Sequence, residues 1–152
     1  MPKSFIISGG GTGGHIFPAL SIAHGLKAQH PDAEIHFIGA KGKMEMTRVP
    51  AAGFSITGVP IAGINRQKPW KSWSVPIKLI YTLWLCRKIL KLRKPDAVIG
   101  TGGYASGPAL LMAQRMGIPT VVQEQNSFAG VTNIKLGAKA KIICTAYKNA
   151  ER

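Results

Sequence analysis

The chain has 152 residues, of which 45% are hydrophobic, so it can bury a core and is too apolar to be disordered. Its 20 basic and 6 acidic residues give a formal net charge of +14, which favours polyanionic partners: nucleic acid, an anionic membrane surface or a phosphorylated substrate. No uncharged apolar run approaches the ~20 residues of a membrane-spanning helix, and the short run before Gly9 is not a signal peptide.

Short apolar runs alternate with helical patterns along the whole chain. Because strands that alternate with helices form βαβ units, the pattern predicts an α/β fold, a Rossmann-like doubly wound parallel sheet, in one domain that covers residues 1–152. In chain order we expect strand Ser4–Ser8, a helix with Pro18 in its first turn that continues to Leu26, strand Glu34–Ile38, helix Met44–Ala52, strand Ser55–Val59, a long helix from about residue 75 to Lys94, strand Ala97–Gly100, a helix through Ala109 and Met116, strand Thr120–Gln123 and strand Lys141–Cys144.

Two glycine-rich segments lie between an expected strand and an expected helix, GGGTGGH at residues 9–15 and TGGYASGPA at residues 101–109. Glycines at such a turn let backbone N–H groups approach an anion at the positive end of the helix, so the two loops together could hold a diphosphate. The alternative is that the glycines serve only tight turns and close packing. A P-loop is excluded because no Gly-Lys-Ser/Thr sequence follows.

The first loop also matches GxGxxG, the pattern of dinucleotide-binding domains. An NAD site needs an acidic residue at the end of the second strand to hold the ribose, but that strand ends in Gly39, Ala40 and Lys41. An NADP-binding oxidoreductase domain remains an alternative, since a lysine there could face a 2′-phosphate.

Polar residues that could act on a sugar lie at the same edge. His15 follows the first glycine loop, where the helix dipole favours a neutral imidazole that can accept a proton from a hydroxyl. The alternative is a histidine that only bonds backbone. Glu124 and Asn126 follow the strand Thr120–Gln123 and could orient a sugar, although Asn126 is equally suited to cap the next helix. Cys86 and Cys144 have no metal-ligand spacing, so we expect buried, reduced thiols and no metal.

Residues 70–94 combine three tryptophans with long aliphatic side chains and seven basic residues. A helix of this composition can lie in the plane of an anionic membrane surface. The alternative is a core helix with solvated lysines at its end. No nucleic-acid-binding motif is visible, so we expect no nucleic acid partner. The residues expected to contact the membrane are Trp73, Ile77, Ile80, Trp84, Arg87, Lys88 and Lys91.

At GGGTGGHIFPALSIA, GAKGKME, GGYASGPALLMA, GIPTVVQEQN and AGVTNIKLGAKA the chain resembles the MurG family of bacterial cell-wall synthesis. The resemblance runs from Ser4 to about Tyr147 and implies the N-terminal half of a GT-B glycosyltransferase without cofactor or metal. That family transfers GlcNAc from UDP-GlcNAc to the 4-hydroxyl of undecaprenyl-diphosphate-linked muramyl-pentapeptide, with inversion.

The resemblance also implies roles for individual residues. His15 is the candidate general base. Thr12, Gly13, Gly14 and Asn126 are expected near the donor sugar and the reaction centre. The acceptor diphosphate is expected near Gly11, Gly102, Gly103 and Tyr104.

In that family a second domain holds the donor nucleotide, and this chain stops before it. We therefore expect no transfer by this chain alone, and a C-terminal domain or partner subunit that completes the cleft. The expected location is the bacterial cytoplasm, peripheral on the cytoplasmic face of the inner membrane. Besides the NADP-binding domain, a non-catalytic membrane-binding scaffold remains an alternative.

Overall fold

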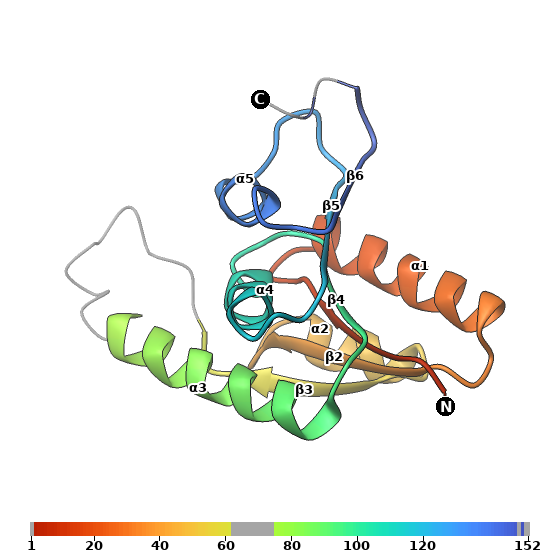
Figure 1. Cartoon of the computed structure of the whole chain (residues 1–152), viewed down its shortest axis with the longest axis horizontal. Helices are drawn as coiled ribbons and strands as arrows, with labels where there is room; N and C mark the ends of the chain where they lie inside the picture. The colour runs from red at the N-terminus through yellow and green to blue at the C-terminus, as the bar shows by residue number, and fades with distance from the viewer. Residues whose placement is uncertain (1, 62–74, 149, 151–152) are drawn as a thin grey trace.

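The computed structural model describes residues 2–61, 75–148 and 150 and forms one parallel sheet with helices on both faces (Figure 1). The strand order is β3-β2-β1-β4-β5-β6, and every neighbouring pair is parallel. The fold class is therefore the expected doubly wound α/β sheet. The strands are β1 Ser4–Ser8, β2 Glu34–Ala40, β3 Ser55–Val59, β4 Ala97–Gly100, β5 Thr120–Glu124 and β6 Ile142–Thr145.

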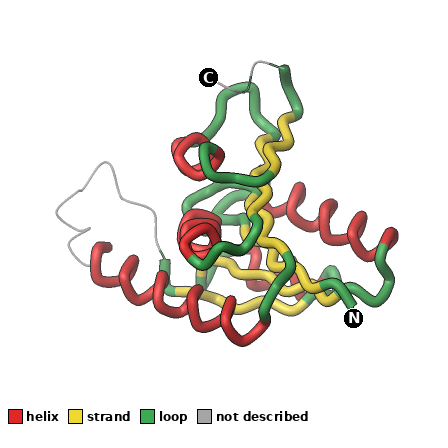
Figure 2. The backbone as a smooth tube through the Cα atoms, in the orientation of Figure 1, coloured by secondary structure: helices red, strands yellow, loops and turns green. Residues whose placement is uncertain are grey.

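Five helices of the described chain cover this sheet (Figure 2). They are α1 Gly13–Gln29, α2 Glu45–Ala51, α3 Val75–Arg93, α4 Ser106–Arg115 and α5 Val131–Gly137. Neighbouring residues of a strand point to opposite faces, so Ile6 packs with α3 and α4 whereas Ile7 packs with α1 and α2. Because both faces are covered, the central strands β1, β2 and β4 are mostly apolar, with buried polar exceptions at Ser8 and His36.

Besides shifts of one or two residues at the ends of β2, α2, β5 and β6, three expectations need correction. Helix α1 begins at Gly13, so Pro18 lies inside the helix rather than in its first turn. Helix α5 had no expected residue range, although capping by Asn126 presupposed a helix after it, because seven residues are too few to show a period. Cys144 is exposed rather than buried, since it lies on the edge strand β6, whereas Cys86 is buried.

The sheet has a topological switch point between β1 and β4, where the order of successive strands changes direction. Strands β2 and β3 follow β1 toward one edge, and β4 then returns to pair with β1, with Ser8 opposite Gly100. Ligands of open α/β sheets bind at the carboxyl ends of the strands at such a switch point. Both glycine-rich loops lie there, because one follows β1 and the other follows β4.

Candidate functional site

The two glycine-rich loops are joined through His15 and Thr101. The Thr101 hydroxyl donates to the backbone oxygen of His15 at 2.7 Å, and the Nδ1 atom of His15 lies 3.0 Å from the backbone oxygen of Thr101. In the described part of the chain, Nε2 of His15 has no hydrogen-bond partner. If Nδ1 carries the proton, Nε2 is left as a free acceptor at the mouth of the loops.

Glycine is required in these loops largely because protein atoms occupy the space of a side chain. A Cβ at Gly102 would lie 2.9 Å from His15 Nδ1, and one at Gly11 would lie 2.8 Å from the ring of Tyr104. Gly102 and Gly103 also have φ of +96° and +77°, a conformation that favours glycine. Four of the residues expected near the acceptor diphosphate, Gly11, Gly102, Gly103 and Tyr104, are therefore brought together with His15.

The first turn of α1 offers open hydrogen-bond donors. The amides of Gly13 and Gly14 have no acceptor among the described residues, as expected for a helix start. Thr12 is the N-cap residue, but its hydroxyl makes no capping hydrogen bond and its side chain is exposed. Since no acidic residue lies in this turn, the positive end of the helix dipole is free to attract an anion.

The buried carboxylate of Glu45 holds the first glycine loop in place. No sequence pattern marked this residue as part of the site. Glu45 begins α2 and is fully buried. Its Oε1 accepts from the Ala40 amide at 2.9 Å, and its Oε2 accepts from the Gly11 amide at 3.2 Å. The Gly11 amide is thus occupied within the protein, whereas those of Gly13 and Gly14 are among the open donors of this loop. The only sequence signal was an acidic residue in a chain that has few.

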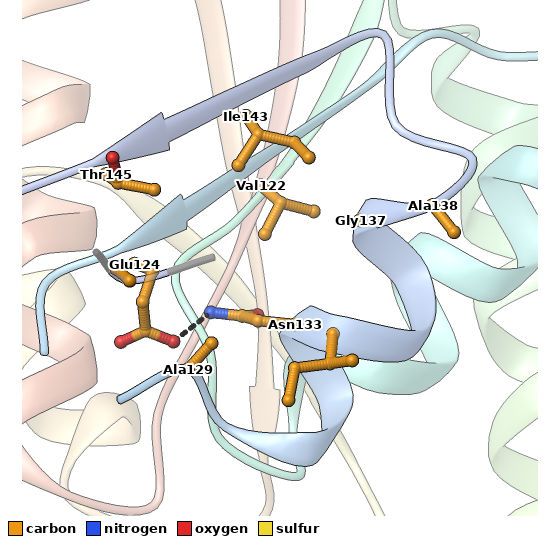
Figure 3. Close-up of a pocket in the computed structure, with 10 residues that line it drawn as sticks. Val122, Glu124, Ala129, Asn133, Gly137, Ala138, Ile143 and Thr145 are labelled. Atoms are coloured by element: carbon orange, nitrogen blue, oxygen red, sulfur yellow. Dashed lines mark hydrogen bonds between the residues drawn. The ribbon is translucent and has the colours of Figure 1, made fainter. Parts of the chain in front are cut away.

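Glu124 organises the loop after β5. Its carboxylate accepts from the amide and side chain of Asn126 and from the Gly130 amide, at 2.9–3.1 Å. It also accepts from the side chain of Asn133 at 2.9 Å (Figure 3). Burial raises the pKa of Glu124, but these hydrogen bonds outweigh burial and hold the pKa below its usual range. Glu124 is therefore a structural anion that fixes the loop carrying Gln125 and Asn126.

Asn126 does not cap the next helix, so the expectation that it serves as a helix cap is wrong. The N-cap residue of α5 is Gly130, and both the amide and the side-chain nitrogen of Asn126 donate to Glu124. The side chain itself is exposed at the carboxyl edge of the sheet. A role of Asn126 in sugar binding stays a prediction.

Helix α3 has a buried face and an exposed face. Cys86 and Leu90 lie in the core, and burial raises the pKa of the Cys86 thiol to about 12. On the opposite face Ile77 is 64%, Ile80 69% and Trp84 55% exposed, at helical spacing. The exposed basic residues Arg87, Lys88 and Lys91 continue the same face, and Lys88 Nζ lies 5.5 Å from the Trp84 ring centroid. Trp73 lies outside the described residues.

Two further expectations concern metal sites and membrane-spanning helices. Within residues 2–61 and 75–148, no cluster of His, Cys, Asp and Glu could hold a metal ion. In the same ranges no helix has the length and apolar character needed to cross a membrane.

Sequence comparison finds close relatives among bacterial proteins. The chain is 62% identical to the UDP-N-acetylglucosamine--N-acetylmuramyl-(pentapeptide) pyrophosphoryl-undecaprenol N-acetylglucosamine transferase of Phocaeicola vulgatus, over 97% of this chain and 39% of that protein. It is 52% identical to the Cytophaga hutchinsonii transferase of the same name, over 99% of this chain and 41% of that protein. The chain thus spans about two fifths of the length of these relatives.

Solved structures agree with this match. Acinetobacter baumannii MurG superposes with a TM-score of 0.86 and 34% identity, over 97% of this chain and 43% of that chain. A UDP-N-acetylglucosamine 2-epimerase, with a TM-score of 0.69 and 14% identity, shares the fold alone.

The family model described as the glycosyltransferase family 28 N-terminal domain matches residues 5–145, which contain both glycine loops, His15 and the Glu124 loop. The chain therefore belongs to glycosyltransferase family 28, as an N-terminal domain of that family.

Proposed function

We propose that this chain is the acceptor-binding domain of an inverting glycosyltransferase that moves GlcNAc from UDP-GlcNAc to a lipid-linked muramyl-pentapeptide. The observation that carries the proposal is the position of His15. Its imidazole is held against the Thr101 carbonyl, and a free Nε2 and the open amides of Gly13 and Gly14 lie at the same loop. The names of the relatives, which share more than half of their aligned residues with this chain, give the substrates.

In the proposed reaction the muramyl 4-hydroxyl attacks the anomeric carbon of UDP-GlcNAc. His15 Nε2 takes the hydroxyl proton, the new bond forms between O4 and the anomeric carbon, and the bond from that carbon to the β-phosphate oxygen breaks. UDP leaves with the bonding electrons, and the configuration at the anomeric carbon inverts. The amides of Gly13 and Gly14 stabilise negative charge at this edge.

The exposed face of α3 suits a peripheral membrane contact. Helix α3 follows β3, so its first residues lie at the carboxyl edge of the sheet, the edge of the glycine loops. Ile77, Ile80 and Trp84 would enter the lipid interface, and the basic residues beyond them would meet anionic headgroups. This arrangement would bring the lipid-linked acceptor to the edge where His15 lies, on the cytoplasmic side of the bacterial inner membrane.

A second domain or subunit would supply the donor site, because the relatives extend well beyond the matched region. We therefore propose that this chain binds the acceptor but does not transfer GlcNAc by itself.

The first test is calorimetric titration of the chain with a short-tailed, water-soluble analogue of the muramyl-pentapeptide diphosphate. Saturable binding of the analogue, with none of NADPH under the same conditions, is the expected result. Binding of NADPH instead would point to a dinucleotide-binding domain and overturn the proposal.

The second test joins this chain to the C-terminal part of the Phocaeicola vulgatus relative. We expect the chimera to transfer GlcNAc from UDP-GlcNAc, and its His15→Ala variant to lose roughly 100-fold or more in kcat, the range of general-base catalysis. An active chimera that keeps full activity without His15 would remove that residue from the mechanism.

A further inference from the structure

Gln125 contacts His15 at Nδ1, the ring nitrogen that also faces the Thr101 carbonyl. The side-chain nitrogen of Gln125 lies 2.9 Å from His15 Nδ1, and the backbone oxygen of Thr101 lies 3.0 Å from the same atom. The two contacts come from residues that follow β5 and β4, so two neighbouring strands converge on one imidazole nitrogen.

These two contacts make opposite demands on Nδ1. If Nδ1 carries the proton and donates to Thr101, the N–H of Gln125 meets another N–H. If Nδ1 instead accepts from Gln125, its lone pair faces the lone pairs of the Thr101 oxygen at 3.0 Å. The Thr101 carbonyl is backbone and can only accept, so the side-chain amide is the group that can change.

A half-turn of the amide resolves the conflict. The oxygen and nitrogen of a glutamine amide have nearly the same shape, so the turned amide occupies the same space. The Oε1 atom of Gln125 is buried and has no hydrogen-bond partner among the described residues, so the half-turn moves the amide nitrogen to that unpartnered position and its gain lies at Nδ1. After the half-turn Oε1 lies beside Nδ1 and accepts from it, together with the Thr101 oxygen.

We propose that Gln125 is a positioning residue that fixes the tautomer of His15. Its side-chain oxygen and the Thr101 carbonyl share the proton on Nδ1, so that Nε2 carries the lone pair and faces the reacting hydroxyl. The inference rests on the proposed role of His15 as the base. A glutamine does this without the negative charge of a carboxylate, which would favour the imidazolium rather than the neutral base.

The test is nitrogen NMR of the histidine rings in the ¹⁵N-labelled chain, since the shifts of the two ring nitrogens distinguish the tautomers directly. The variants are Gln125→Leu, which removes both hydrogen-bonding atoms, and Gln125→Glu, which keeps only acceptors. Gln123→Leu is the matched control, because Gln123 lies two residues away and also has a buried, unpartnered Oε1 among the described residues. Urea unfolding of each variant checks that it is folded.

We expect His15 in the unchanged chain to show the Nδ1-protonated tautomer alone. Gln125→Leu should give a mixture of the two tautomers, whereas Gln123→Leu should keep the single form. Gln125→Glu should keep the proton on Nδ1 and raise the share of the doubly protonated ring. An Nε2-protonated ring in the unchanged chain would mean that Gln125 donates, which overturns the inference. A single Nδ1-protonated form in Gln125→Leu would mean that Thr101 alone fixes the tautomer, which also overturns it.

The spectra report the tautomer whether or not the chain takes part in glycosyl transfer. If His15→Ala kept full activity in the chimera, the proposed base would be wrong, but the NMR result on the tautomer would be unchanged. Failure of this inference is therefore separable from failure of the proposed function.

Discussion

The backbone of Gly103 lies directly against the carbonyl oxygen of Gly10, so that a Cβ on Gly103 would overlap this oxygen. The contact joins the loop after β4 to the loop after β1 at the switch point of the sheet. The same Cβ would also lie 3.0 Å from Cδ2 of His15. The small size of Gly103 therefore sets how closely the loops approach and where the His15 ring rests.

We predict that Gly103→Ala displaces the first glycine loop and weakens acceptor binding. The closest obstacle is backbone, which cannot rotate away as a flexible side chain could. Gly117→Ala is a matched control, since Gly117 has a φ of +71°, against +77° for Gly103, and a Cβ placed on it would meet nothing within 4 Å. Both variants carry the conformational penalty of about 1 kcal/mol, so only Gly103→Ala should lose more than this in urea unfolding and also lose affinity for the diphosphate analogue. Equal losses in the two variants would contradict the loop contact.

Glu124→Gln should loosen the loop that carries Gln125 and Asn126. The four N–H groups around Glu124 all donate, so an amide nitrogen in place of one oxygen must face at least one of them. We expect a loss of about 2 kcal/mol in the free energy of unfolding and faster exchange of the Gly130 amide. The control is Glu34→Gln, at an exposed position. It should change the free energy of unfolding by no more than about 0.5 kcal/mol and leave the exchange rate of the Gly130 amide unchanged. An unchanged exchange rate at Gly130 would contradict the predicted role.

Replacing Arg87, Lys88 and Lys91 with glutamine should weaken sedimentation with anionic vesicles. Each basic residue near such a surface contributes about 1 kcal/mol, and the contribution falls as salt screens the charges. The difference from the unchanged chain should therefore be largest at low salt. Lys135, Lys139 and Lys141 are also exposed and lie on or near α5 and β6, so their triple replacement has the same net charge and serves as the control. Equal loss in both triple variants would mean that net charge, rather than α3, determines binding.

Local pattern predicted the sheet well, because buried parallel strands are short apolar runs bounded by glycine and proline. Ser4–Ser8, Ser55–Val59 and Ala97–Gly100 begin and end where expected. The start of α1 was misplaced, since the glycines of its first turn are poor helix formers and the period becomes visible only from Ala19.

The contacts within the site could not be predicted from local sequence patterns. Glu45 bonds Gly11 and Gln125 contacts His15, pairs that are 34 and 110 residues apart. Such pairs follow from the strand order, which the sequence pattern alone did not specify. The glycine loops were recognised as a candidate ligand site, but their packing against Thr101, Tyr104 and His15 required the placement of β4 beside β1.

His36 makes the stability of the chain depend on pH below neutrality. Its ring nitrogens lie 2.7 Å from the Ser55 hydroxyl and 2.8 Å from the Thr57 hydroxyl. Burial, with a smaller contribution from the positive charge of Arg93, lowers the pKa of His36 from 6.5 to about 4. The unfolded chain therefore binds a proton at this residue at a higher pH than the folded chain does.

The contribution of His36 to stability is complete above pH 6.5, decreases as the pH falls from 6.5 to about 4, and is lost below that. The pKa difference corresponds to a loss of up to about 3 kcal/mol. His36→Gln, which can still bond a hydroxyl but does not titrate, should flatten the stability curve in this window. His24→Gln, at an exposed position of α1, should leave the curve unchanged. Urea unfolding at half-unit steps of pH measures both, and a curve for His36→Gln as steep as that of the unchanged chain would assign the acid loss to other groups.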